Sequence, residues 1–482
     1  MTESSVNNPP DESQIPFDES QPLDDSQIAP EGPSLKRRVI RGSLWTLGGH
    51  FATQFLRLAS NLIVSRLLFP KAFGLMGLVY TVISGLELLS DLGIQPNVIQ
   101  SKRQDEQFLN TAWTLAILRG LVLWLGSCAI AIPVASFYQE PLLTYLLPIV
   151  CLKVLVESFT STNLWIANRN LQLNKVTVID VSTTISVVII QVLAAWIAFI
   201  TKAPQDLAIW ALVVGLVPAS FVKVLMSHFY IKGERNRLAW EPEAFQELQR
   251  FGKWIFFSSF LTFFALHGNN LLLPKLTSIE FFGVFIIALN LSKLPSEVLN
   301  MVNTRVLYPS YAELVRERPD RLYPALRRAR LVLNGLNWGV SLFFILFGKF
   351  LIGIMYDSRF AQAGWILQLL AVGNLITWLS FSYMNVLMAQ GKTFIMSTFM
   401  AIQVFCQFAC VFAGYYFSAS DPGSYPDPRN YAIVLGIAAV GWLLYPFQAF
   451  FLARLKIWQP EIDLPALAAA TGIALLLAFQ II

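Results

Sequence analysis

Long apolar segments alternate with short polar connections along most of the 482-residue chain. A membrane-crossing helix needs about 20 mostly apolar residues, and the pattern predicts thirteen such helices. They are expected at residues 43–65, 73–95, 112–137, 142–166, 177–200, 207–230, 252–274, 281–305, 331–356, 361–388, 394–418, 431–453 and 464–482. The short alternating segments of a transmembrane barrel do not occur. The pattern therefore predicts an all-α polytopic membrane protein of about 12–14 transmembrane helices.

The composition agrees with this class, because 55% of the residues are hydrophobic and only 13% are charged. A soluble protein carries about a quarter charged residues. The connections are too short for a soluble catalytic domain. With only three histidines a His-based metal site is improbable, and neither a cofactor nor a nucleic-acid partner is predicted. The cysteines lie in apolar segments and are interpreted as small buried residues: Cys128, Cys151, Cys406 and Cys410.

The first 35 residues differ sharply from the rest, since they hold eight carboxylates and neither Lys nor Arg. They also hold a degenerate repeat, DESQ, DESQ and DDSQ. This composition predicts a disordered acidic tail, with a docking segment for a cytoplasmic partner as the alternative. It is the opposite of a signal peptide, which starts with a basic region. Without the tail, the net charge rises from +5 to +13.

The distribution of Lys and Arg predicts the orientation. When the connections are sorted alternately from a cytoplasmic N-terminus, 23 basic residues fall on the cytoplasmic side and 6 on the outer side. Cytoplasmic connections carry the excess of Lys and Arg in membrane proteins. The N-terminus is therefore expected in the cytoplasm, and the C-terminus outside if the thirteenth segment spans the membrane.

The chain partly matches itself at a shift of 209 residues. The informative matches are Arg41 with Arg250, Trp45 with Trp254, Asn61 with Asn270, Phe73-Gly74 with Phe282-Gly283, and Arg119 with Arg328. Six segments separate the copies, so both enter the membrane in the same sense. This predicts two parallel six-helix bundles around a central cavity, with chance alignment of apolar runs as the alternative. The expected division is 1–35 (tail), 36–230 and 231–453 (bundles), and 454–482 (an extra membrane segment).

Several charged residues fall inside the predicted spans, where a charge costs about 2.5–3.5 kcal/mol on insertion scales. Two Lys-Glu pairs share a spacing of four residues, which puts both side chains of a pair on one helix face. They are Lys153 with Glu157, and Lys293 with Glu297. Arg57 lies at a similar depth. We interpret Arg57, Lys153 and Lys293 as cavity cations that bind an anionic substrate. The alternative is that each Lys-Glu pair only neutralises itself and lowers the cost of insertion.

Other polar residues of the spans are candidates for gating or ion coupling. They are Glu87, Asp91, Glu157, Glu297 and His267. For His267, a hydrogen-bonded packing role is the competing interpretation. Pro295 removes a helix hydrogen bond, so it is a candidate hinge, although it could equally be only a feature of helix shape.

A family resemblance lies in three stretches of the sequence. They are RGSLWTLGGHFATQFLRLASNLIVSRLLFPKAFGLMGLV, DLGIQPNVIQ and FLNTAWTLAILRG. With the turn ANRNLQL, they resemble the bacterial polysaccharide transporters, the Wzx-like lipid-linked oligosaccharide flippases of the multidrug/oligosaccharidyl-lipid/polysaccharide exporter superfamily. The type nearest to this chain is the colanic-acid exporter. The resemblance is specific over residues 37–170 and weakens to helix pattern and repeat organisation beyond.

The resemblance implies two six-helix bundles around a V-shaped cavity in a bacterial inner membrane. It implies that an undecaprenyl-diphosphate-linked oligosaccharide moves from the cytoplasmic to the periplasmic leaflet by alternating access, with membrane lipids, a polysaccharide polymerase and glycosyltransferases as further partners. Arg57, Glu87 and Asp91 match the polar pattern of the family. Members have twelve or fourteen spans, so the thirteenth segment here is expected to be a truncated pair or a half-inserted helix.

Two other functions remain as alternatives. An ion-coupled multidrug exporter of the same superfamily would favour a cavity dominated by carboxylates, whereas three central cations favour an anionic substrate. A membrane-embedded glycan-processing enzyme would need a metal cluster or an acid–base pair on a long external loop, and the sequence has neither.

Overall fold

The computed structural model describes residues 35–91, 93–101, 103, 105–421, 424 and 426–481, with side chains except at 35–44, 249–258, 305 and 478–481. The acidic tail predicted at residues 1–35 lies outside these residues apart from Leu35, where the first helix begins. Across the described ranges the chain forms helices and connections and no strand.

Helices follow one another along the whole described chain. Those of the first half are α1 (Leu35–Leu67), α2 (Pro70–Leu89), α3 (Ile94–Gln100), α4 (Glu106–Tyr138), α5 (Leu143–Ser158), α6 (Thr162–Arg169), α7 (Leu173–Ile200), α8 (Gln205–Ala208), η2 (Ile209–Leu212) and α9 (Leu216–Phe229). Those of the second half are α10 (Pro242–Leu276), α11 (Ile279–Val302), η3 (Asn303–Leu307), α12 (Tyr308–Glu317), η4 (Pro319–Arg321), α13 (Leu322–Met355), η5 (Ser358–Phe360), α14 (Ala363–Ala389), α15 (Thr393–Tyr416), α16 (Pro428–Arg454) and α17 (Pro460–Ile481).

Each of the thirteen predicted spans coincides with one helix or a run of short ones. Ten helical segments are long and apolar enough to cross a membrane, or eleven if the bent pair α5–α6 is one span, counted over the described residues. Helices α1 and α10 occupy the two other predicted spans and are not among these. Both carry polar residues within the predicted span, Arg57 in α1 and His267, Asn269 and Asn270 in α10.

Local sequence signals account for where several helices begin. The carboxylate of Asp105 accepts a hydrogen bond from the Phe108 amide at the start of α4 (3.1 Å), and the Ser278 hydroxyl accepts one from Phe281 at the start of α11 (3.1 Å). Proline occupies the first position of α2, α10 and α16, where its missing N–H is no loss. The 66° bend between α5 and α6 lies where Ser161 caps the second helix.

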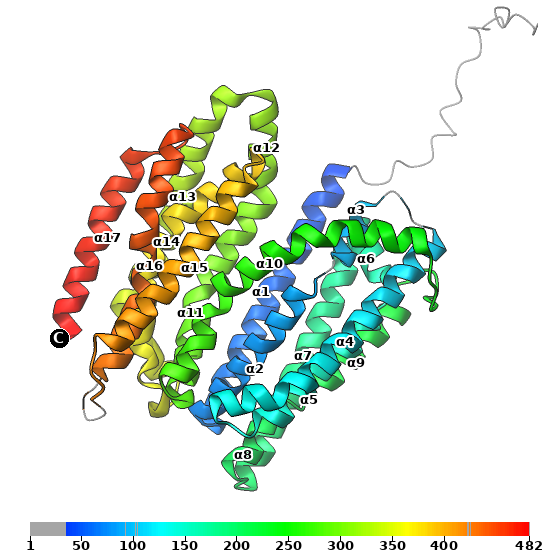
Figure 1. The fold of residues 1–482 in the computed structure, drawn as a ribbon, viewed down its shortest axis with the longest axis horizontal. Helices are drawn as coiled ribbons and strands as arrows, with labels where there is room; N and C mark the ends of the chain where they lie inside the picture. Colours follow the sequence, from blue (N-terminus) through cyan, green and yellow to red (C-terminus); the bar gives the residue numbers. More distant parts are fainter. Residues whose placement is uncertain are drawn as a thin grey trace, which may run out of the picture.

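The helices form two bundles that lie side by side (Figure 1). In the first, α1 packs on α7, α4 on α5, and α9 on both α5 and α7. In the second, α14 packs on α11, α13 and α16, and α15 packs on α16. The predicted all-α fold of two parallel bundles is confirmed. The residue boundaries predicted for the bundles stay a prediction.

Helix α10 connects the bundles. It contacts α2, α3 and α4 of the first bundle and α15 of the second. At its start, Arg103 forms ion pairs with Glu241 (2.9 Å) and with Asp105 (2.8 Å). The hydrogen bonds from Arg103 lower the pKa of Asp105 below the usual value of an aspartate. These ion pairs fasten the start of α10 to the first bundle.

The bundles meet where α2 crosses α11. A Cβ atom on Gly74 would collide with the carbonyl oxygen of Ile279, and one on Gly283 would collide with the carbonyl oxygen of Pro70. The shift of 209 residues relates Gly74 to Gly283 and Pro70 to Ile279. The two contacts are therefore the same contact made twice, as a two-fold axis between parallel repeats requires.

Further contacts between the bundles gather at the end of the molecule where α1 ends and α2 begins, which we call the joined end. Arg359 donates a hydrogen bond to the carbonyl oxygen of Arg66 (3.1 Å), and the rings of Phe73 and Phe360 lie edge to face at 5.6 Å. Lys275 of α10 donates to the carbonyl oxygen of Phe137 in α4 (2.7 Å). Side chains and backbone together hold this end closed.

The last helix, α17, is continuous and docks on the second bundle through a buried ion pair. Arg330 of α13 and Asp463 of α17 are both fully buried and are bonded to each other. The remaining donors of Arg330 reach Ser382 (2.8 Å), Tyr383 (2.6 Å) and two further oxygens, those of Gln459 and Leu379. Since all its donors are used, Arg330 fixes α17 at the edge of the bundle (Figure 1).

Large apolar side chains are exposed in both bundles. Examples are Phe55, Trp196, Leu346, Phe405 and Leu476. A water-soluble monomer rarely exposes so much contiguous apolar surface, whereas a helix that faces lipid must. The exposed faces therefore agree with a multi-pass membrane protein.

Candidate functional site

A cavity of about 640 Å³ lies inside the first bundle and is called the central cavity below. Helices α1, α2, α5, α7 and α9 line it, and Ile286, Ile287 and Asn290 of α11 complete its wall. Its charged lining residues are Arg57, Lys153, Glu157, Asp180 and Lys223. Charged groups in a membrane-embedded bundle normally face a cavity or a partner, and these five face one cavity.

Helical spacing brings these side chains together. Lys153 and Glu157 are four residues apart and lie on one face of α5. On α7 the lining residues Asp180, Thr184 and Gln191 are four and seven residues apart, which is about one and two helical turns, so they lie on one face of the helix that is turned inward.

One carboxylate is shared by two ammonium groups. Glu157 Oε2 lies 2.7 Å from Lys223 Nζ, and Glu157 Oε1 lies 3.5 Å from Lys153 Nζ. The hydroxyl of Ser220 also donates to Glu157 Oε1 (3.4 Å). With Arg57 and Asp180, the cavity holds three cations and two carboxylates, so its formal charge is +1.

Arg57 has no hydrogen-bond or ion-pair partner within the part of the chain that the structure describes, and its side chain is exposed. A planar guanidinium presents five N–H groups in an arrangement that matches the oxygens of a phosphate. An anion that enters the central cavity can therefore bind Arg57 without displacing a protein group.

The structure brings together three of the predicted residues, Arg57, Lys153 and Glu157. The Lys153–Glu157 pair exists, but it is not isolated, because Glu157 lies closer to Lys223. The sequence interpretation missed Lys223 and Asp180. Both are charged residues inside predicted spans, 207–230 and 177–200, so the criterion that found the others also applies to them.

The second Lys-Glu pair has different surroundings. Lys293 and Glu297 lie on α11 outside the lining of the central cavity, and among the described side chains they form no ion pair within 4.0 Å. Instead, Glu297 accepts a hydrogen bond from Gln54 of α1, which joins the two bundles. Pro295 lies inside the continuous α11. The roles assigned to Lys293 and Pro295 stay predictions.

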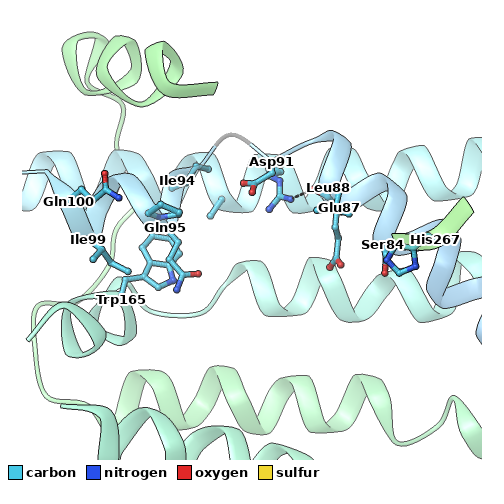
Figure 2. A pocket seen from close by; sticks show the side chains of 13 residues that line it. Ser84, Glu87, Leu88, Asp91, Ile94, Gln95, Ile99, Gln100, Trp165 and His267 are labelled. Carbon is cyan, nitrogen blue, oxygen red and sulfur yellow. Dashed lines mark hydrogen bonds between the residues drawn. The ribbon is translucent and has the colours of Figure 1, made fainter. Parts of the chain in front are cut away.

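A second cavity, of about 700 Å³, is lined by the end of α2 and the turn after it, by α3, by two residues of α4, and by one residue each of α6 and α10. Three of the candidates for gating or ion coupling, Glu87, Asp91 and His267, lie here. Figure 2 shows Glu87, Ser84 and His267 towards one end of this cavity, and Trp165 and Gln95 together towards the other.

Hydrogen bonds fix the backbone at the end of α2 and in the turn after it, where the acidic residues of the second cavity lie. Arg119 of α4 donates to the carbonyl oxygens of Glu87 (2.7 Å) and Ser90 (2.9 Å), which the helix end leaves without backbone partners. Asp91 accepts a hydrogen bond from the Gly93 amide (2.9 Å), and Gly93 adopts a left-handed conformation, φ 63°. Arg119 thus positions the end of α2, and the Glu87 carboxylate is left to the cavity.

A third cavity, of about 600 Å³, lies between the other two. It shares Glu87, Arg119 and Trp165 with the second cavity, and Glu157 and Lys223 with the central one. The three cavities therefore form a polar passage along the first bundle.

The remaining site predictions concern metals and thiols. In the described ranges no three His, Cys, Asp or Glu residues are placed so that they could hold a metal ion. The cysteines are free; Cys151 and Cys406 are buried and Cys128 and Cys410 half-buried.

Comparison with known proteins identifies relatives. A family described as "Polysaccharide biosynthesis protein" matches residues 63–364. The lipopolysaccharide biosynthesis protein WzxC of Escherichia coli (strain K12) is 22% identical over 373 residues, which cover 77% of this chain and 74% of that protein. The succinoglycan biosynthesis transport protein ExoT of Rhizobium meliloti (strain 1021) is 20% identical, over 70% of this chain and 66% of that protein.

Two solved structures share the fold. An inward-facing multidrug resistance MATE transporter of the MOP superfamily aligns with a TM-score of 0.63 at 13% identity, over 84% of this chain and 95% of that one. The lipid II flippase MurJ, in an inward closed conformation, aligns with a TM-score of 0.61 at 14% identity, over 90% and 92%. At these identities the likeness establishes the two-bundle fold alone.

Proposed function

Because the chain belongs to the polysaccharide biosynthesis protein family, we propose that it carries a lipid-linked oligosaccharide across the bacterial inner membrane. The observation that carries this proposal is the net positive charge of the central cavity, together with Arg57, which has no hydrogen-bond or ion-pair partner among the described residues. Relatives named for lipopolysaccharide biosynthesis and succinoglycan transport support a role in surface-polysaccharide assembly.

The chemistry of the central cavity favours a phosphate-bearing substrate. Hydrogen bonds between a cationic donor and a phosphate oxygen are about twice as strong as neutral ones, and the surrounding low dielectric strengthens them further. Lys153 and Lys223 already share one carboxylate, so each keeps donors for a second acceptor. Three cations around one cavity thus suit the diphosphate of an undecaprenyl-diphosphate-linked repeat unit.

The proposed direction is from the cytoplasmic to the periplasmic leaflet by alternating access. The excess of basic residues at one side supports a cytoplasmic position for the start of α1, and with that orientation the joined end faces the periplasm. The substrate head enters the passage from the cytoplasmic side. It leaves when the bundles separate at the joined end.

A multidrug exporter is the nearest competing function, since that fold is shared. A cationic drug would bind best in a cavity of net negative charge, and the central cavity carries the opposite sign. A glycan-processing enzyme finds less support, because the family and the relative named as a transport protein point to transport. These observations favour a transporter over an enzyme.

Deletion of the gene in its own host tests the proposal. We expect surface polysaccharide to fall and the undecaprenyl-linked oligosaccharide to accumulate in the membrane fraction, and re-expression of the chain should reverse both changes. Lipid extraction followed by mass spectrometry of the glycolipid gives the direct readout. Unchanged polysaccharide and glycolipid, with increased sensitivity to cationic drugs, would favour the exporter.

A further inference from the structure

The second cavity differs in charge from the central one. Among the lining residues that the structure describes, the acidic side chains are Glu87 and Asp91. Arg119 is the one permanent cation of this described lining, and it donates to the carbonyl oxygens of Glu87 and Ser90. An anion is therefore repelled from this cavity, whereas it is attracted to the central cavity. The two ends of the polar passage favour different chemical groups.

Several polar groups of the second cavity have no partner among the described residues. The side chains of Gln95, Gln100 and Trp165 make no hydrogen bond, and the carboxylate of Glu87 makes none either. An amide supplies both donors and acceptors, an indole N–H donates, and an ionised carboxylate accepts. This set matches a ligand that has many hydroxyl groups, because each hydroxyl can donate and accept.

Trp165 adds an apolar face to this polar set. Its side chain is half-buried on α6, and Figure 2 shows it beside Gln95 at one end of the cavity. An aromatic ring that carries an N–H group at its edge binds ligands that have an apolar face and polar, hydrated edges. A pyranose ring has this character, since its C–H bonds gather on its faces and its hydroxyl groups lie around its edge.

We propose that the second cavity is a subsite for uncharged sugar residues of the lipid-linked oligosaccharide, with Trp165 as the stacking surface and Gln95, Gln100 and Glu87 as hydroxyl partners. This inference rests on the proposed function. The third cavity joins the two, so a single substrate places its diphosphate at Arg57 and its sugars beside Trp165. A volume of about 700 Å³ is that of a small-molecule site.

Binding to the full-length protein in lipid nanodiscs tests the subsite with two probes. One is undecaprenyl diphosphate, which has no sugar; the other is the undecaprenyl-linked oligosaccharide extracted from the host that lacks this chain. We expect Trp165→Ala and Gln95→Ala to raise the Kd of the glycolipid about tenfold and to leave the Kd of undecaprenyl diphosphate unchanged. Arg57→Ala should weaken the binding of both probes.

Matched variants control for folding and for surface effects. Trp196→Ala removes a tryptophan that is 54% exposed on α7, away from all three cavities, and should change neither Kd. Gln95 is exposed, so its truncation leaves the fold intact. Equal weakening of both probes by Trp165→Ala, or no effect on the glycolipid, would overturn the sugar subsite alone. Failure of the wild-type protein to bind either lipid would overturn the proposed function and the subsite with it.

Discussion

The carboxylate of Glu157 sets how many cations of the central cavity remain available to a substrate. It bonds Lys223 at 2.7 Å and Lys153 at 3.5 Å, so one negative charge is divided between two ammonium groups. Arg57 stays without a partner among the described residues. Removing any one of the three cations makes the formal charge of the cavity zero.

Arg57→Ala and Lys223→Ala are each expected to reduce polysaccharide export at least about tenfold, because a hydrogen bond between charged groups contributes about 1.5–3 kcal/mol. Arg57→Lys should retain part of the activity, since it keeps the charge but loses the planar donors. Export is measured as surface polysaccharide after complementation, with the membrane level checked by immunoblot. Arg235→Ala, in an exposed connection, removes a charge elsewhere and should have no effect. Normal export by both alanine variants would rule out the cation site.

The pair on α11 provides a separate prediction. Lys293→Ala should abolish complementation, and the double variant with Glu297→Ala should behave like it, because these two side chains do not pair with each other and Glu297 contacts Gln54 instead. Restored activity in the double variant would mean that the pair serves only to lower the cost of insertion. Complementation and membrane level are measured together.

At the scale of helices, the crossing of α2 and α11 depends on two glycines. At each of these glycines, backbone atoms of the facing helix lie where the Cβ atom of any other residue would be. Since backbone atoms cannot rotate away, the helices themselves must shift if a methyl group is added.

Gly74→Ala is expected to lower the stability of the purified protein by about 1–3 kcal/mol, the usual cost of overpacking, and to reduce export. Gly126→Ala is the matched control, because no atom lies within 4 Å of the added Cβ. That change should be neutral or slightly stabilising in a helix. Thermal unfolding in detergent compares the two, and equal melting temperatures would show that the crossing can relax.

The docking of α17 gives the largest expected stability effect. Asp463→Ala leaves the buried guanidinium of Arg330 without its counter-charge, which costs about 3–5 kcal/mol. Glu461→Ala removes an exposed carboxylate that lies 4.0 Å from Arg327 and accepts a hydrogen bond from Tyr323, and it should cost far less, because exposed ion pairs contribute little to stability. Thermal unfolding again gives the comparison. A loss for Asp463→Ala no larger than for Glu461→Ala would mean that packing on α14 alone holds α17.

At the scale of the whole molecule, the position of the cavities relative to the membrane depends on orientation. With the start of α1 in the cytoplasm, the second cavity at the end of α2 is nearest the cytoplasm and the joined end faces outward. This order suits the loading of a substrate made in the cytoplasm.

Labelling of single cysteines in a cysteine-free background tests the orientation. A membrane-impermeant maleimide added to intact spheroplasts should label Gln205→Cys at the start of α8 and should not label Arg235→Cys; both sites are exposed. After lysis both should react. The reverse pattern in intact spheroplasts would invert the proposed direction of transport.

The sequence alone was sufficient for the fold class, because the free energy of placing a residue in lipid is a local property that adds up along a segment. The thirteen predicted segments are helical. The 209-residue repeat contained Gly74 and Gly283, which meet at the axis between the bundles. The family resemblance, read from residues 37–170, is confirmed by the family match over 63–364.

Only the tertiary structure decided which charges meet, because that depends on helix rotation and on partners far apart in sequence. The same spacing occurs in Lys153–Glu157 and Lys293–Glu297, yet only the first pair lines the central cavity. Lys223, 66 residues after Glu157, reaches the same carboxylate because α9 packs on α5. Local polarity thus predicted that charges within the spans would line a cavity, and helix packing determined which of them share one.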